Sequence, residues 1–434
     1  MELESLEDLV IHSILTKLGP QEAAAIACLS RRLRVLASDE QLWRLFCFRD
    51  LDLSSPQDPS GNPLGSFKAY YSRFTLLLHL ISIVSEFQRL VYSSQTLLVL
   101  FPSMQCARTF QKGASEAKLN EVEDKLGLKL PVATRVLYRF CDGQEIPQAS
   151  SVPLLGLIGG YSFYNHMVNV YLLPLSRVVN ETRMLESQLG LLTGSQYILV
   201  AASIYDEKLF FLDCANGQLF VGTTKLARNG HMIRCVPDAL IRSVHDVTSD
   251  LPQDAMLLWL EEHGRRLQSG MMRVHDEGGI RSLSLFPETL PYCSTAVTNG
   301  VQVRASAVFV PELYNYPKKN KYVFSYSIRM RLLPQGCMLD GVCHQSCQLY
   351  WRHWIIHAND TVVSEVSDAA VIGKHPLLYL DGEEFVYESC SSIPASGTIE
   401  GDFTFVPGRL DSPKGRKFDV VVAQFPLEVP EYVF

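Results

Sequence analysis

The last third of the chain consists of short strand-like runs separated by turn residues, and this pattern limits the fold more than any other feature. β-Branched and aromatic residues dominate each run, and successive side chains of a strand point to opposite faces of a sheet. From about Ile280 onward we therefore expect a β-sandwich or a β-barrel. The runs are VQVRASAVFV (301–310), YVFSYSIRMRLL (322–333), CQLYWRHWIIHA (347–358), EEFVYESCSS (383–392), GDFTFVP (401–407) and KFDVVVAQFPL (417–427).

The first 50 residues have a helical period instead. Gly19-Pro20 predicts the end of a first helix and the start of a second, because Pro fits the first turn of a helix. Ser30 is a candidate N-cap for a third helix. Residues 51–112 begin with a Pro- and Gly-rich stretch and predict a linker with an uncertain helical segment. The apolar stripe of the first helix, at steps of three and four residues, comprises Leu6, Leu9, Val10, Ile14 and Leu18.

Residues 113–250 mix both periods and predict an α+β domain. Ser115 is a candidate cap for a helix that ends at Gly127, and a second helix is expected over 132–141. Strand-like runs follow, and Asn216-Gly217 predicts a hairpin with a type I′ turn. Residues 251–279 predict a connector helix, with Asp254 near its start and Arg265-Arg266 near its end.

Composition and charge argue against several classes of protein. The net charge is −7, and 47% of the residues are apolar, which argues against both nucleic-acid wrapping and a disordered chain. The apolar run 74–84 is about half of the roughly 20 residues that a spanning helix needs, so no membrane segment is expected. The 11 scattered cysteines and the acidic N-terminus indicate a reducing compartment, and we expect the nucleus and the cytoplasm.

The opening residues resemble an F-box, with Leu9-Val10 in place of the usual Leu-Pro pair. GASEAKLNEVEDKLGLKLPVATRVLYRFCDGQE (113–145) resembles the start of a SUKH-type domain. KYVFSYSIRM, YWRHWIIHAND, AVIGKHPLL, FVYESCSS and GTIEGDFTF are similar to segments of the ApaG domain. These three domains in this order are the architecture of the F-box only protein family, and the match is nearest to its plant members named for interaction with the Skp adaptor. The F-box resemblance rests on Leu9-Val10, Ile14-Leu15, Leu18, Gly19-Pro20, Ala27 to Leu33, Leu42-Trp43 and Phe46.

The resemblance implies a multidomain α+β protein. It would have an all-α F-box at 1–50, a SUKH-type α+β domain at 113–250 and an immunoglobulin- or fibronectin-like β-sandwich at 280–434. The implied function is the substrate-recognition subunit of an Skp–cullin–F-box E3 ubiquitin ligase, with no catalytic group, cofactor or metal of its own. The F-box would bind the Skp adaptor and, through it, the cullin, and the C-terminal domains would bind an unknown target protein. The implied adaptor-binding residues are Leu9, Ile14, Leu15, Pro20 and Leu29, with Trp43 behind them.

For the target, the candidate patch is the run Trp351, Arg352, His353 and Trp354, because Trp and Arg are enriched at binding hot spots. An odd number of steps separates the two tryptophans, so in a strand they point to opposite faces and only one can be a surface anchor. The turn from Asp368 to Gly373 is the second choice.

Three other constellations are interpreted as structural. Cys343, Cys347, His353 and His357 have zinc-like spacings, but two histidines four residues apart in a strand would lie about 13 Å apart at roughly 3.3 Å per residue. Bacterial ApaG domains carry a glycine-rich turn with possible phosphate-binding use. The matching segment 368–373 replaces its first two glycines by an acid and an alanine, which argues against phosphate. Glu261-Glu262-His263 is interpreted as a solvated helix face.

An alternative of a different class is a small-ligand sensor or enzyme, with a nucleotide-like effector on the SUKH-type or ApaG-type domain. Fold alone does not exclude it. The sequence contains no G-x-S-x-G, P-loop, H-E-x-x-H or kinase motif, so binding is favoured over catalysis.

Overall fold

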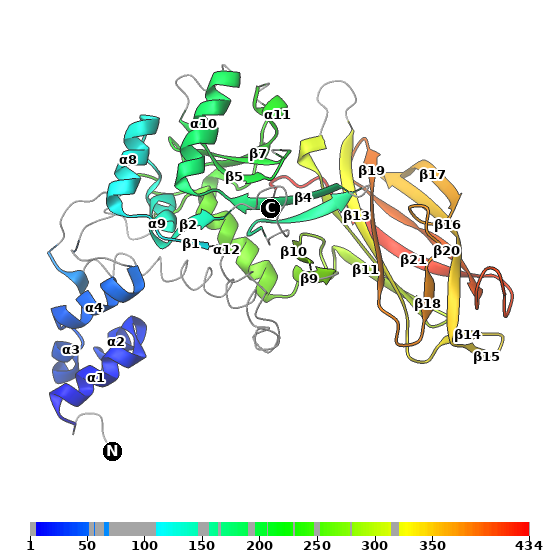
Figure 1. Ribbon diagram of the computed structural model, residues 1–434, viewed down its shortest axis with the longest axis horizontal. Helices are drawn as coiled ribbons and strands as arrows, with labels where there is room; N and C mark the ends of the chain where they lie inside the picture. The colour runs from blue at the N-terminus through cyan, green and yellow to red at the C-terminus, as the bar shows by residue number, and fades with distance from the viewer. Residues whose placement is uncertain are drawn as a thin grey trace.

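In the computed structural model the chain forms three parts in sequence order: a helical N-terminal unit, a central mixed domain and a C-terminal β-sandwich (Figure 1). Among the described residues, no helix is long and apolar enough to cross a membrane. The apolar run 74–84 and most of the predicted linker lie outside the described residues. The structure describes residues 6–51, 56, 65–68, 110–145, 156–163, 166–189, 196–205, 207–228, 231–246, 252–277, 280–313 and 321–433.

Short helices with clear start and stop signals build the N-terminal unit. Gly19, with φ of 106°, separates the first two helices, and Pro20 occupies the first position of the second, as the sequence predicts. The Ser30 hydroxyl accepts a hydrogen bond of 3.2 Å from the Leu33 amide and caps the third helix, which confirms that prediction. The helices are α1 (Asp8–Leu18), α2 (Pro20–Ile26), α3 (Arg31–Leu36) and α4 (Glu40–Leu51).

The central domain packs helices against a mixed sheet. Ser115 caps α8 by accepting from the Lys118 amide, and Gly127 ends that helix in the left-handed conformation, both as expected. In the described residues the sheet has eight strands in the order β8-β7-β6-β5-β4-β3-β10-β9, and only β10 and β3 pair in parallel. The helices are α8 (Glu116–Leu126), α9 (Val132–Phe140), α10 (Leu175–Leu189), α11 (Thr224–Arg228) and α12 (Ala255–Gln268). The strands of the sheet are β3 (Gly159–Phe163), β4 (His166–Leu172), β5 (Tyr197–Ser203), β6 (Leu209–Asp213), β7 (Leu219–Gly222), β8 (Ile233–Arg234), β9 (Arg273–Glu277) and β10 (Ile280–Ser284), while β1 (Phe110–Lys112) pairs with β2 (Cys141–Gln144).

The helix predicted within residues 251–279 is present as α12, with Asp254 as its N-cap, but the structure corrects its role as a connector. Trp259 of α12 is 1% exposed and packs edge-on against Phe210 of β6, so the helix is part of the central core. β9 and β10 then extend the central sheet, and the sandwich begins at β11, not at residue 280. The physical reason is the apolar face of α12, which covers the sheet and keeps the following chain beside it.

The same helix corrects the prediction of a solvated Glu261-Glu262-His263 face. His263 is 3% exposed, its Nε2 lies 2.9 Å from the Leu157 carbonyl oxygen, and its ring stacks on Trp259. Burial lowers the pKa of His263 to about 4. His263 is therefore a core histidine held by a backbone group.

The hairpin at Asn216-Gly217 exists, but its turn is not type I′. A type I′ turn needs positive φ at both central residues, whereas only Gly217 has it, at 76°. The Gly217 amide donates to the Asp213 carbonyl at 2.7 Å, and the Asp213 carboxylate accepts from the Ala215 amide at 2.9 Å. These bonds hold a longer loop between β6 and β7.

The C-terminal domain is a β-sandwich, as predicted. In the described residues one sheet has the order β11-β12-β13-β19, and the other has five strands in the order β17-β16-β20-β21 with β18 beside β16. Apolar side chains from both inner faces form one core. The strands are β11 (Cys293–Thr298), β12 (Val301–Phe309), β13 (Tyr322–Leu332), β16 (Ser346–Ala358), β17 (Thr361–Ala369), β18 (Leu377–Tyr379), β19 (Phe385–Ile393), β20 (Gly397–Pro407) and β21 (Phe418–Leu427), with a small hairpin of β14 (Cys337–Leu339) and β15 (Val342–His344) and a short 3₁₀ helix, η4 (Pro311–Leu313).

The central domain and the sandwich meet along a seam. The Ser325 hydroxyl of β13 donates to the Ser162 carbonyl of β3 at 2.6 Å, and the Tyr161 hydroxyl donates to Glu312 of η4. Val310 and the C-terminal Val433 belong to the same apolar cluster as the central domain. The chain end therefore returns to the central domain after the last sandwich strand (Figure 1).

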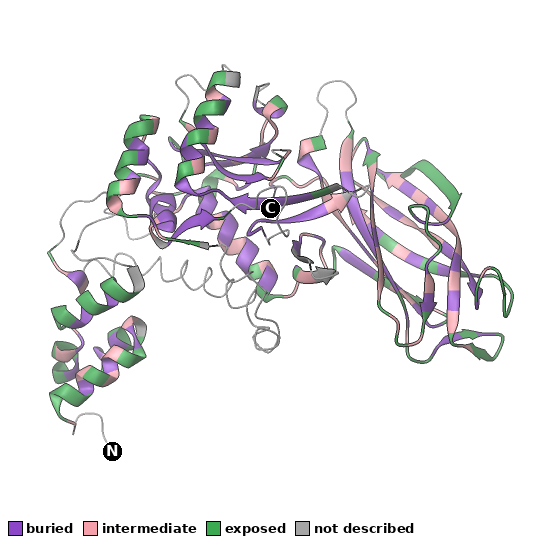
Figure 2. Cartoon of the chain, in the orientation of Figure 1, coloured by how far each residue is buried: buried purple, intermediate pink, exposed green. Residues whose placement is uncertain are grey.

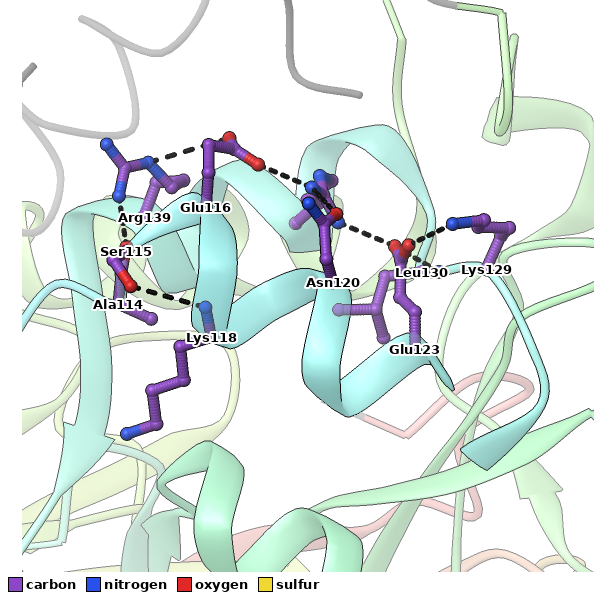
Figure 3. Close-up of polar contacts among 10 residues, drawn as sticks. Ala114, Ser115, Glu116, Lys118, Asn120, Glu123, Lys129, Leu130 and Arg139 are labelled. Carbon is purple, nitrogen blue, oxygen red and sulfur yellow. Dashed lines mark hydrogen bonds and ion pairs between the residues drawn. The ribbon is translucent and has the colours of Figure 1, made fainter. Parts of the chain in front are cut away.

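A buried ion cluster joins α8 to α9 in the central domain (Figure 3). The Arg135 guanidinium is 3% exposed and donates to Glu123 at 2.8 Å, to Asn120 at 2.8 Å and to Glu116. Glu123, itself 4% exposed, also accepts from the Leu130 amide and from Lys129. Burial raises the pKa of Glu116, although Arg135 opposes the shift.

Replacing Arg135 by Met should strongly weaken this part of the domain, because it removes the buried charge that Glu116 and Glu123 share and leaves Glu123 paired with the exposed Lys129. Loss of one partner of a buried pair costs about 3–5 kcal/mol. Amide hydrogen exchange of α8 and α9, read by mass spectrometry, measures the local effect in a chain of several domains. The control is Lys125→Met, which removes an exposed pair with Glu121 and should cost about 0.3–0.5 kcal/mol. Equal protection in both variants would contradict the prediction.

Candidate functional site

Some of the predicted adaptor-binding residues are buried in the core of the N-terminal unit, and others lie on its surface. Leu15 is fully buried at 0% exposure, and Trp43 is 3% exposed with its indole N–H donating to the Ala37 carbonyl at 2.7 Å. Both side chains therefore hold the unit together and cannot touch a partner directly. Leu15 packs inside with Ile11, one turn away, so Leu15 and Trp43 can only support a docking face from behind. Adaptor binding by this set of residues stays a prediction.

The surface members are Leu9, 81% exposed, and Leu29, 72% exposed, while Ile14 and Pro20 are half-buried. Isolated exposed leucines are common, but here further large apolar side chains are exposed on the same small unit. The sequence stripe included Val10 and Leu18 but gave no sign of the others, because exposure depends on how the helices pack. The further exposed residues are Val10, Leu18, Val35, Leu45 and Phe48.

A polar contact brings the two exposed leucines to the same end of the unit. Arg32, at the start of α3, donates to the Asp8 carboxylate of α1 at 2.5 Å and to the Leu6 carbonyl at 2.7 Å. Leu9 directly follows Asp8, and Leu29 lies three residues before Arg32. Leu9 and Leu29, both exposed, therefore lie on segments joined by the same ion pair. Figure 2 shows further exposed positions along the helices of this unit.

The opposite side of the unit is not free. Its apolar cluster continues into Phe67 and into residues of the central domain, namely Ala133 and Val136 of α9 and Leu257 of α12. The Phe67 amide also donates to Glu40 of α4 at 2.5 Å. One side of the unit is therefore fixed to the rest of the chain, while the apolar surface around Leu9 and Leu29 remains exposed.

In the sandwich, the alternation predicted for the two tryptophans holds. Trp354 is 3% exposed and packs edge-on against Phe403 at 5.3 Å, whereas Trp351 is half-buried on the other face of β16. Arg352 shares the face of Trp354, and its charge acts on the buried hydroxyls of Tyr326 and Tyr387. Of the predicted target patch, only Trp351 and His353 thus belong to the outer face.

His353 lies between two carboxylates on that outer face. Its Nε2 is 2.9 Å from Glu365 and its Nδ1 is 3.1 Å from Asp402, and these hydrogen bonds raise the pKa of His353. His357 makes a similar contact of 3.2 Å with Glu400. The outer face is therefore acidic, with each histidine held by carboxylates.

The zinc-like spacing does not bring its members together. Cys347 is buried beside Cys337, while Cys343 is exposed and donates to the Gln335 carbonyl. Among the described residues, no group of three or more His, Cys, Asp or Glu side chains is arranged to hold a metal ion.

The turn at 368–373 has left-handed backbone positions like those of a glycine-rich loop but keeps only the last glycine, Gly373. Ala370 and Gly373 have φ of 69° and 74°, and Ile372 has φ of 45°, all in the left-handed region. The Asp368 carboxylate accepts a hydrogen bond from the Ala369 amide and so occupies a donor that a phosphate could use. The residues present do not form a phosphate cradle.

The edge strand β17 was not anticipated from the sequence. Every residue from Thr361 to Ala369 is exposed, including Val362 at 58%, Val363 at 44% and Val366 at 36%. Edge strands are normally protected by Lys, Pro or short length, because their free backbone groups can pair with another chain. β17 has nine residues and contains neither Lys nor Pro.

Comparisons with known proteins agree with this arrangement. Two family models match the chain, the SMI1 / KNR4 family (SUKH-1) over residues 113–239 and the ApaG domain over residues 312–407. The F-box protein SKIP16 of Arabidopsis thaliana is 51% identical over 443 residues, and the alignment covers 100% of this chain and 100% of the relative. The chain belongs to this family of F-box proteins. The finding confirms the family resemblance and the α+β class with an ApaG-type sandwich.

More distant relatives share all or part of the chain. F-box only protein 3 of Homo sapiens is 24% identical over 438 residues, which is 100% of this chain and 84% of the relative. Protein ApaG of Anaeromyxobacter dehalogenans (strain 2CP-C) is 35% identical over 138 residues, which is 32% of this chain and 96% of the relative. The sandwich of this F-box protein thus corresponds to a protein that exists separately in bacteria.

Substitution of the two tryptophans should separate core from surface. Trp354→Ala should destabilise the sandwich by about 3–5 kcal/mol, because it empties a site between aromatic rings. Trp351→Ala should change stability by no more than about 1 kcal/mol, since its ring is on the outer face. Hydrogen exchange of β16 and β20 reports both effects. A loss of protection in Trp351→Ala as large as that in Trp354→Ala would show that both rings are structural.

Proposed function

We propose that the protein is the substrate-recognition subunit of an Skp–cullin–F-box E3 ubiquitin ligase. The exposed apolar surface around Leu9 and Leu29 binds the Skp adaptor and, through it, the cullin, and the chain contributes no catalytic group. Its relatives are named F-box proteins, and the N-terminal unit leaves large apolar side chains exposed, which supports this assignment. The complex works in the nucleus and the cytoplasm by holding a target near a charged E2, which raises the effective concentration.

The target binds to residues 113–434, on the outer face and free edge of the five-stranded sheet. The N-terminal surface is occupied by the adaptor, so it cannot also hold a target. In the part of the chain that the structure describes, β17 is the edge strand of its sheet and offers a backbone edge to an extended segment. Glu365, Glu400 and Asp402 favour a basic segment beside it. Trp351 and His353 are the side-chain contacts proposed on this face.

The adaptor assignment predicts that Leu9→Asp combined with Leu29→Asp abolishes co-purification with the Skp adaptor. A carboxylate placed in an apolar interface loses its hydration without gaining a partner. Because both positions are exposed, the free energy of unfolding should change by less than about 0.5 kcal/mol. Leu15→Asp is unsuitable, because it would unfold the unit.

The matched control is Val297→Asp with Val421→Asp, two valines of the sandwich that are each 52% exposed. The control should retain the adaptor at the wild-type level. Circular dichroism and hydrogen exchange of α1–α4 establish that both double variants are folded. Undiminished adaptor binding by the folded Leu9/Leu29 variant would overturn the F-box docking surface.

The target surface is tested by Val362→Lys on β17 against Val297→Lys on β11, an exposed valine of the other sheet of the sandwich. A lysine on a free edge blocks strand addition, and it also repels a basic segment. Proximity labelling in cells should show a set of ubiquitinated proteins that is lost with Val362→Lys and retained with Val297→Lys. An identical set for both variants would place the target elsewhere.

A further inference from the structure

A cavity of about 390 Å³ lies at the seam between the central domain, the sandwich and the C-terminal residues 428–433. This size is within the range of about 300–1,000 Å³ typical of small-molecule sites, which prefer domain interfaces. We call it the seam cavity. Its walls are largely apolar and include Met271, Met272, Leu285, Val308, Phe309 and Pro430.

One buried lysine lines this cavity. Lys208 is 3% exposed, and a tight turn fixes its position, because the Ser203 hydroxyl accepts from the amides of Glu207 and Lys208. The Lys208 ammonium donates to the Tyr161 hydroxyl at 3.2 Å and lies 4.7 Å from the centre of the Tyr161 ring. Among the described residues, that hydroxyl is the hydrogen-bond acceptor of the ammonium.

The hydrogen bonding of the Lys208 ammonium is incomplete among the described residues. A lysine ammonium has three N–H donors, and a buried charge is costly unless it is paired and hydrogen-bonded. The charge of Glu312 lies close enough to act on it, but among the described residues Glu312 accepts its hydrogen bond from the Tyr161 hydroxyl and not from the ammonium. Burial lowers the pKa of Lys208, and the charge of Glu312 opposes that shift. A carboxylate in the cavity would provide the missing acceptor.

The other charged residues that line the cavity determine which anions fit it. Arg266 also lines the cavity but is already paired with Glu262 at 2.7 Å. Glu428 and Glu431 are exposed and line the same cavity, so they disfavour a ligand with several negative charges such as a nucleotide. A single negative charge on an apolar body matches both the buried ammonium and the apolar walls.

We propose that the seam cavity binds a small apolar monocarboxylic acid, whose carboxylate accepts hydrogen bonds from the Lys208 ammonium. The apolar body of the ligand lies against the methionines and Phe309. Because the walls come from the central domain, the sandwich and the chain end, the bound acid stabilises their packing against one another. This site is separate from both the adaptor surface and the free edge of β17.

Three probes with one apolar body test the proposal on the full-length protein: phenylbutyrate, phenylbutyramide and phenylbutylamine. In titration calorimetry the acid should bind saturably, the amide at least about tenfold more weakly, and the amine not at all. Lys208→Met should reduce the affinity for the acid to that for the amide. Lys374→Met, which removes an exposed lysine of the sandwich, should leave all three results unchanged.

A second variant makes the test independent of any structural role of Lys208. Met271→Trp fills the cavity from a half-buried wall position while Lys208 stays in place, and it should abolish binding of the acid. Equal affinity of the wild type for acid and amide overturns the proposal, as does an acid preference that survives in Lys208→Met. Absence of saturable acid binding at millimolar concentration overturns it as well.

Discussion

The carboxylate of Asp254 organises the centre of the molecule. It is fully buried and accepts hydrogen bonds from the Leu257 amide, which caps α12, and from the amide and hydroxyl of Thr134 in α9. Burial raises the pKa of Asp254 against the effect of these bonds. The next residue, Ala255, donates to the Gly217 carbonyl at 2.7 Å, so one short segment positions α12 against both α9 and the β6–β7 loop.

Beyond Asp254, helix α12 contributes side chains to two apolar clusters. Leu257 belongs to the apolar cluster of the N-terminal unit, whereas Trp259 and Leu260 belong to the cluster of the central domain. Neighbouring side chains of one helix therefore fix the F-box to the central domain. The seam at Tyr161 and Ser325 fixes the central domain to the sandwich, and the result is one continuous body with the F-box at one end and β17 toward the other (Figure 1).

The sequence was sufficient for features that depend on near neighbours. The caps at Ser30 and Ser115, the helix break at Gly19-Pro20 and the opposite faces of Trp351 and Trp354 follow from local geometry. Features set by distant partners were not predictable. His263 is buried because its ring nitrogen meets the Leu157 carbonyl, 106 residues away in the chain. Likewise, the helical period of α1 is compatible with burying either of two apolar faces. Only the packing of α1–α4 determines that Leu15 is buried and Leu9 is exposed.

The proposed ligase role depends on how the domains are connected to one another. Proximity raises an effective concentration only if the linkage spans the required distance, and a flexible connection dilutes the gain as it lengthens. Here the F-box shares apolar contacts with α9 and α12, so the described parts of the chain are connected by packing as well as by the linker. A ligand in the seam cavity would act on the remaining joint, between the central domain and the sandwich. The seam is therefore a place where a small molecule could alter the position of a bound target without touching either proposed interface.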